Sequence, residues 1–180
     1  MTGDPAELAA GQRAAARSYE EFPYYAARFR ERGMRFGISD SGWLLTLCDL
    51  SRTRALEQID WLASVLAARG MPRLLLERHL EILREELPTP RCAMLTTAAR
   101  HLRAKRLRYI DEETARNLAA TFAEPLPNLG ALLVAAVSDE ADGVAHAVES
   151  ILRWIDETYD ADVQGGARAL IEEARNAARA

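Results

Sequence analysis

The segment Arg69–Pro72 contains a glycine, Gly70, and two residues later a proline, Pro72. This short junction strongly constrains the fold. Gly70 can adopt the left-handed backbone conformation that closes the C-terminus of a helix, and Pro72 suits the first turn of a new helix. Apolar residues recur at three- and four-residue steps on both sides of the junction. The sequence therefore predicts a tight helical hairpin over residues 53–87.

Each predicted helix of the hairpin carries one apolar stripe. The first stripe runs from Leu56 to Leu66 and the second from Leu76 to Leu87. Charged residues of both signs occupy the other side of the second helix, as expected for a helix with one solvated face. We therefore expect the hairpin to be the centre of the fold. The predicted core positions are Leu62, Leu66, Leu76, Leu80, Leu83 and Ile151.

Similar helix stop and start signals recur along the rest of the chain. We expect a helix to end at Gly33, new helices to begin at Ser39–Ser41, Asp111 and Ser138–Asp139, and a loosened link over residues 160–166. No segment alternates apolar and polar residues in the manner of a β-strand. The sequence predicts an all-α fold: a single-domain irregular bundle of about seven to nine helices over residues 1–180, with residues 1–20 as a loosely packed N-terminal helix.

The composition excludes several classes of partner. Apolar residues make up 49% of the chain, which is ample for a packed core, and the formal net charge is -4. Nucleic acids and anionic membranes require a basic face, so we expect neither as a partner. No export signal and no membrane-spanning apolar run is visible, which indicates a cytoplasmic protein. In that compartment Cys48 and Cys92 are expected to be reduced, packed thiols.

Most of the aromatic residues of the chain lie within one short segment, between Tyr19 and Trp43. Such residues can clasp small helices together, line a pocket for an apolar ligand, or form a patch for a protein partner. Our first hypothesis is a non-enzymatic interaction or sensory and regulatory domain that uses an aromatic-lined groove. Its candidate binding residues are Tyr24, Tyr25, Phe29, Phe36 and Trp43.

His79 supports an alternative hypothesis. It lies at the flank of the second apolar stripe, and imidazole is a common iron ligand in helical pockets. The chain would then be a sensor that binds a small molecule or a haem-like tetrapyrrole near His79. A boundary histidine that hydrogen-bonds its neighbours is the other interpretation of this residue.

Asp142, His146 and Glu149 support a third hypothesis, a metal-dependent helical enzyme. If one helix covers residues 138–155, these three residues share one of its faces. The same spacing is also typical of ion pairs on a solvated face. Phosphate-binding loops, nucleophile elbows and paired metal-binding histidines are absent from the sequence, so we favour a non-enzyme. The sequence names no cofactor, and a homodimer is a further alternative to a protein partner or an apolar small ligand.

Overall fold

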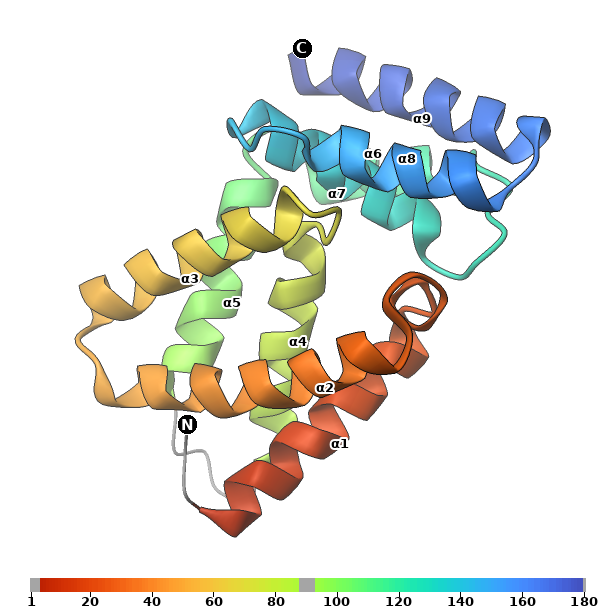
Figure 1. The fold of residues 1–180 in the computed structure, drawn as a ribbon. Coiled ribbons are helices and arrows are strands. Elements are labelled where there is room, and N and C mark those ends of the chain that lie inside the picture. The colour runs from red at the N-terminus through yellow and green to blue at the C-terminus, as the bar shows by residue number, and fades with distance from the viewer. Residues whose placement is uncertain (1–3, 88–92, 180) are drawn as a thin grey trace. The chain divides into compact units, whose positions relative to one another are not determined.

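The computed structural model describes residues 4–87 and 93–179. Within these ranges the regular structure is helical throughout and no strand is present, which confirms the predicted all-α fold. The helices, labelled in Figure 1, are α1 (Pro5–Glu21), α2 (Tyr24–Thr46), the short 3-10 helix η1 (Leu47–Asp49), α3 (Arg52–Ala67), α4 (Arg73–Glu86), α5 (Ala93–Arg106), α6 (Glu112–Ala120), α7 (Leu129–Ala141), α8 (Ala147–Thr158) and α9 (Ala161–Arg179).

The chain divides into two compact units. The first unit comprises the described residues of Met1–Asp60 and Leu76–His101, and the second comprises those of Trp61–Leu75 and Leu102–Ala180. The chain passes between the units within α3, α4 and α5. A single domain over residues 1–180 therefore stays a prediction.

The predicted junction between α3 and α4 is confirmed. Gly70 has a positive φ of 78°, and α4 begins at Arg73, directly after Pro72. The predicted core positions are buried, with one exception: Leu66 is only half-buried, so that prediction is wrong. The confirmed core positions are Leu62, Leu76, Leu80, Leu83 and Ile151. None of the described helices combines the length and apolarity that a membrane span requires.

Small side chains bring α1 and α2 together in the first unit. A Cβ atom built on Gly11 would lie 2.9 Å from Cβ of Ser41, so this position leaves room for glycine only. A Cβ atom on Gly37 would lie 3.6 Å from Cβ of Ala15. Asp4 caps the start of α1 by accepting a hydrogen bond from the backbone N–H of Ala6 at 2.8 Å. The two helix backbones are therefore closely packed.

The helix boundaries expected at Gly33 and at Ser39–Ser41 are wrong, because α2 continues through both. A Cβ atom on Gly33 would clash with the hydroxyl oxygen of Tyr19 and would lie 2.5 Å from Cβ of Phe29. Glycine is needed there for close packing and not to end a helix. The true irregularity of α2 is at Arg30, whose φ of 51° and ψ of -150° kink the helix.

Helix α7 forms the core of the second unit. Apart from Ala131, every residue from Leu129 to Asp139 is buried. The helix restart expected at Ser138–Asp139 is therefore wrong. The break comes later, where Gly143 has a φ of 88°, and α8 begins only at Ala147.

Two further expectations are corrected. Residues 161–166 belong to α9 and are not a loosened link; Asp160 accepts a hydrogen bond from the backbone N–H of Val163 at 3.1 Å, which caps the helix. Cys48 is disulfide-bonded, so the expectation of a reduced thiol at this position is wrong. The other cysteine of the chain, Cys92, lies outside the described residues, as do Pro88 and Pro90.

Candidate functional site

The predicted aromatic site residues lie on α2, in the first unit, but they differ in exposure. Tyr24 is fully buried, whereas Tyr25, Phe29 and Trp43 are half-buried. Phe36 is 54% exposed, which is unusual for a phenylalanine on a packed helix. The five residues therefore do not share one environment. The structure separates an inner group, which packs, from Phe36 and Trp43 farther along the helix.

The inner aromatic group joins the start of α2 to the end of α1. The rings of Tyr19 and Tyr25 stack with centroids 5.1 Å apart and an interplanar angle of 7°. Phe29 meets Tyr24 edge-on, with centroids 6.0 Å apart. Burial raises the pKa of Tyr24 to about 12, so its hydroxyl is neutral. These contacts support the packing interpretation for Tyr24, Tyr25 and Phe29.

The kink at Arg30 lies next to this aromatic group. The hydroxyl of Tyr19 donates a hydrogen bond to the carbonyl oxygen of Arg30 at 3.2 Å. The backbone of Arg30 lies near the region that glycine alone adopts without strain. The strained residue therefore occurs where the aromatic packing ends and the outward face of α2 begins.

The outward face of α2 carries the exposed Phe36, the half-buried Trp43 and exposed arginine side chains. Helical spacing places residues 32, 35, 36, 39 and 43 on one side of the helix, opposite the buried Ser41 and Leu44. The guanidinium carbon of Arg32 lies 5.5 Å from the centroid of the Phe36 ring, a cation–π contact. We name this surface the α2 face, defined by Arg32, Arg35, Phe36, Ser39 and Trp43.

His79 is buried between the two closely packed helices and is not on the α2 face. Its Nδ1 lies 2.8 Å from Oγ of Ser18 on α1, and its Nε2 lies 2.9 Å from Oγ of Ser41 on α2. Burial lowers the pKa of His79 to about 4, so the ring is neutral near pH 7. An iron ion could bind either nitrogen only by displacing a serine hydroxyl. The geometry thus favours the hydrogen-bonding interpretation of His79 over the tetrapyrrole alternative.

The three residues of the metal hypothesis do not share a helix face. Asp142 ends α7, whereas His146 and Glu149 lie at the start of α8, beyond the break. Nδ1 of His146 lies 2.7 Å from Glu149, and the carboxylate of Asp142 lies 2.5 Å from Nη1 of Arg73. Among residues 4–87 and 93–179, no group of three or more histidine, cysteine, aspartate or glutamate side chains is arranged to hold a metal ion.

Sequence reasoning missed a buried polar cluster in the second unit. Asp139 is fully buried on α7 and accepts a hydrogen bond from the backbone N–H of Arg73 at 2.9 Å, which caps the start of α4. Nε of Arg73 lies 3.5 Å from the other carboxylate oxygen. Burial raises the pKa of Asp139 to about 7. A substrate cannot reach this carboxyl group, so its role is structural. An aspartate two residues after an apolar run was the only signal in the sequence.

Comparisons of this chain with protein-family models, with curated proteins and with solved structures each found no match.

Proposed function

We propose that this chain is a non-enzymatic interaction module whose α2 face binds an acidic protein segment through apolar anchors. The observation that carries the proposal is the exposure of Phe36 beside two arginines on one side of a helix. Arginine and aromatic residues are enriched at the energetic centres of protein interfaces, where they combine apolar area with directed hydrogen bonds. Phe36 and Trp43 are the candidate anchors.

The charge of the α2 face indicates the chemistry of the partner. Its charged residues, Arg32 and Arg35, are both exposed and both positive, although the whole chain carries a formal net charge of -4. A partner with carboxylates around its apolar residues would complement the face electrostatically, and this complementarity would speed association and favour the correct partner.

The spacing of the anchors indicates the shape of the partner. Phe36 and Trp43 are seven residues apart, which is about 10 Å along a helix at 1.5 Å per residue. A partner helix with apolar residues at positions i and i+7 presents its anchors at the same separation. We therefore propose that the occupant is an acidic amphipathic helix.

Photo-crosslinking can identify this partner. A benzophenone amino acid replaces Phe36 in the full chain, which is expressed in its native cells, and the cross-linked segment is sequenced. A second variant carries the same group at Trp61, an apolar residue of the second unit that is 63% exposed, as the matched control. We expect position 36 to capture a segment rich in aspartate and glutamate with apolar residues at helical spacing, and position 61 not to capture it.

The captured segment is then synthesised as a labelled peptide and titrated against purified variants. Phe36→Ala should raise the Kd about tenfold or more, as truncation of an interface anchor does, and Trp61→Ala should leave it unchanged. The double variant Arg32→Ala/Arg35→Ala should weaken binding and make it less sensitive to salt.

Three outcomes would overturn the proposal. Position 36 could cross-link only to other copies of this chain, which would make the face a homodimer contact. It could cross-link to RNA, which would make the arginines a nucleic-acid contact. It could also capture nothing beyond the Trp61 control. A fall in melting temperature of Phe36→Ala by about 5 °C or more would likewise count against a free surface and assign Phe36 to packing.

A further inference from the structure

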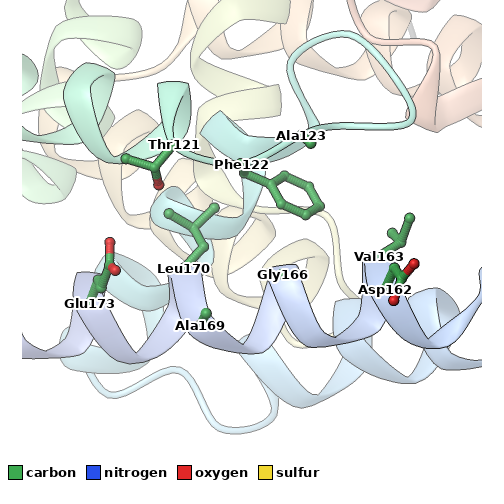
Figure 2. Close-up of a pocket in the computed structure, with 9 residues that line it drawn as sticks. All are labelled: Thr121, Phe122, Ala123, Asp162, Val163, Gly166, Ala169, Leu170 and Glu173. Atoms are coloured by element: carbon green, nitrogen blue, oxygen red, sulfur yellow. The ribbon is translucent and has the colours of Figure 1, made fainter.

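A groove in the second unit lies between the end of α6 and one side of α9, and it is separate from the α2 face. Its volume is about 360 Å³, within the range of small-molecule sites. Figure 2 shows the ring of Phe122, from the segment that follows α6, beside Gly166 of α9. The lining residues are Thr121, Phe122, Ala123, Asp162, Val163, Gly166, Ala169, Leu170 and Glu173.

The middle of the groove is apolar. Phe122, Val163 and Leu170 are the larger apolar residues of the lining; Val163 is half-buried, whereas Phe122 and Leu170 are buried and present only an edge to the groove. A Cβ atom on Gly166 would lie 3.2 Å from the Phe122 ring, so glycine is what allows the ring to lie against the backbone of α9. An aliphatic chain placed here would exchange water for contact with these side chains.

The two ends of the groove are acidic. Asp162 and Glu173 project from α9 at opposite ends of the lining, as Figure 2 shows. They are eleven residues apart, which is about 16 Å along the helix. The C-terminus of α6, which directly precedes Thr121, adds the negative end of a helix dipole. Each end of the groove therefore carries one negatively charged side chain.

Neither groove carboxylate has an ion-pair or hydrogen-bond partner among the described residues. Neighbouring acids on α8 and α9 do have partners: Asp156 pairs with Arg168 at 2.7 Å, and Glu172 pairs with Arg175 at 2.8 Å. Asp162 lies in the first turn of α9, where the positive end of the helix dipole stabilises a carboxylate. Glu173 lies far from that end, so the dipole does not explain an acid at this position.

We propose that this groove binds an elongated organic cation that carries a positive charge at each end of an aliphatic body. The aliphatic body would lie along Phe122, Val163 and Leu170, and the charged ends would meet Asp162 and Glu173. The proposal is independent of the α2 face, which lies in the other unit.

Decamethonium, with two quaternary ammonium groups on a ten-carbon chain, is the probe, and hexamethonium is its shorter analogue. Each is titrated into the full chain by isothermal calorimetry. We expect saturable one-to-one binding of decamethonium and binding of hexamethonium at least about fivefold weaker, because the shorter chain reaches only one carboxylate. Spermine is the third ligand; it carries charge along its middle and should bind more weakly than decamethonium, because the apolar floor disfavours inner charges.

Adjacent acids on α9 provide matched variants. Glu173→Gln and Asp162→Asn should each weaken decamethonium binding by about threefold to fivefold, which is the range expected for a solvent-exposed ion pair. Glu172→Gln removes the same charge from the neighbouring residue outside the groove and should leave the affinity unchanged. Ala169 is exposed, so Ala169→Trp should fold normally and block the groove.

Several results would overturn the proposal. Equal losses in Glu172→Gln and Glu173→Gln would reduce the effect to net charge. Equal or tighter binding of spermine or hexamethonium would remove the role of the aliphatic floor. Undiminished binding to Ala169→Trp, or no saturable binding to the unmodified chain, would place the ligand elsewhere or nowhere.

Discussion

Nδ1 of His79 lies 2.8 Å from the hydroxyl oxygen of Ser18. This is one of four polar contacts around the His79 ring, and only three hydrogen atoms are present to form hydrogen bonds in them. Nε2 lies 2.9 Å from Oγ of Ser41. Each serine also reaches the carbonyl oxygen four residues earlier, Ala14 at 2.9 Å and Gly37 at 2.7 Å. Two hydroxyls and a neutral imidazole hold three hydrogens in total. A fourth would make the ring cationic, which burial opposes.

The first prediction is that His79 contributes to the free energy of unfolding near neutral pH and that acid removes this contribution. Its pKa is about 4 in the folded chain and 6.5 in the reference state. The unfolded chain binds the proton more tightly, so this contribution is complete above about pH 6.5 and is lost as the pH falls to about 4. The expected loss is about 3 kcal/mol. Urea unfolding at several pH values measures it.

His79→Leu isolates this effect. Both serines can then donate to their own carbonyls, so no polar hydrogen loses its partner. Near pH 7 we expect the variant to be about as stable as the parent, within roughly 1–2 kcal/mol. Between about pH 6.5 and pH 4 the parent should lose stability relative to the variant. Two parallel curves of unfolding free energy against pH would contradict the assignment.

The second prediction concerns the kink in α2. Arg30 has a φ of 51° and a ψ of -150°, a conformation that costs a non-glycine residue about 1–3 kcal/mol. Arg30→Gly should therefore stabilise the chain by about 1 kcal/mol after the extra backbone entropy of glycine is subtracted. Arg32→Gly, in the regular part of α2, should destabilise it by about 1 kcal/mol. Chemical denaturation measures the change in the free energy of unfolding for both variants. Changes of the same sign would contradict the strain assigned to Arg30.

Helix boundaries could be predicted from the sequence where the capping chemistry was local. Gly70 and Pro72 mark the end of one helix and the start of another, and Asp111 caps α6 with hydrogen bonds from the N–H groups of the next turn. The helix end predicted at Gly33 was wrong because a glycine can be required for either of two reasons. One is a positive φ, and the other is the absence of a side chain where another group packs closely. Glycine is required at Gly33 because Tyr19 packs closely against it, and at Gly143 because the backbone has a positive φ.

The polar contacts inside the two units could not be predicted from the sequence. Ser18 and His79 are 61 residues apart, and Arg73 and Asp139 are 66 apart. Periodicity assigns residues to a helix face, but it does not say which faces meet. Phe36 and Trp43 could be proposed from composition alone, whereas the groove on α9 depends on a contact between Phe122 and Gly166 that only the fold reveals.

The third prediction concerns Asp139. Burial raises its pKa from 3.8 to about 7, so the folded chain holds this proton more tightly than the unfolded chain does. The stabilising contribution is complete below about pH 3.8 and is lost as the pH rises through about 7. Asp139→Asn does not titrate and keeps an oxygen for the backbone N–H of Arg73. Its stability relative to the parent should therefore rise between about pH 4 and pH 7. A constant difference in the free energy of urea unfolding would contradict this.

The fourth prediction uses two adjacent glycines of α9. A Cβ atom on Gly165 meets nothing within 4 Å, so Gly165→Ala should stabilise the chain by about 1 kcal/mol and raise the melting temperature by about 2–4 °C. A Cβ atom on Gly166 would lie 3.2 Å and 3.3 Å from two atoms of the Phe122 ring, so Gly166→Ala should gain less or destabilise. If residues 160–166 were a loose link, neither substitution would gain helix stability and both would behave alike. Thermal unfolding of the two variants therefore tests both the start of α9 and the contact that forms the groove floor.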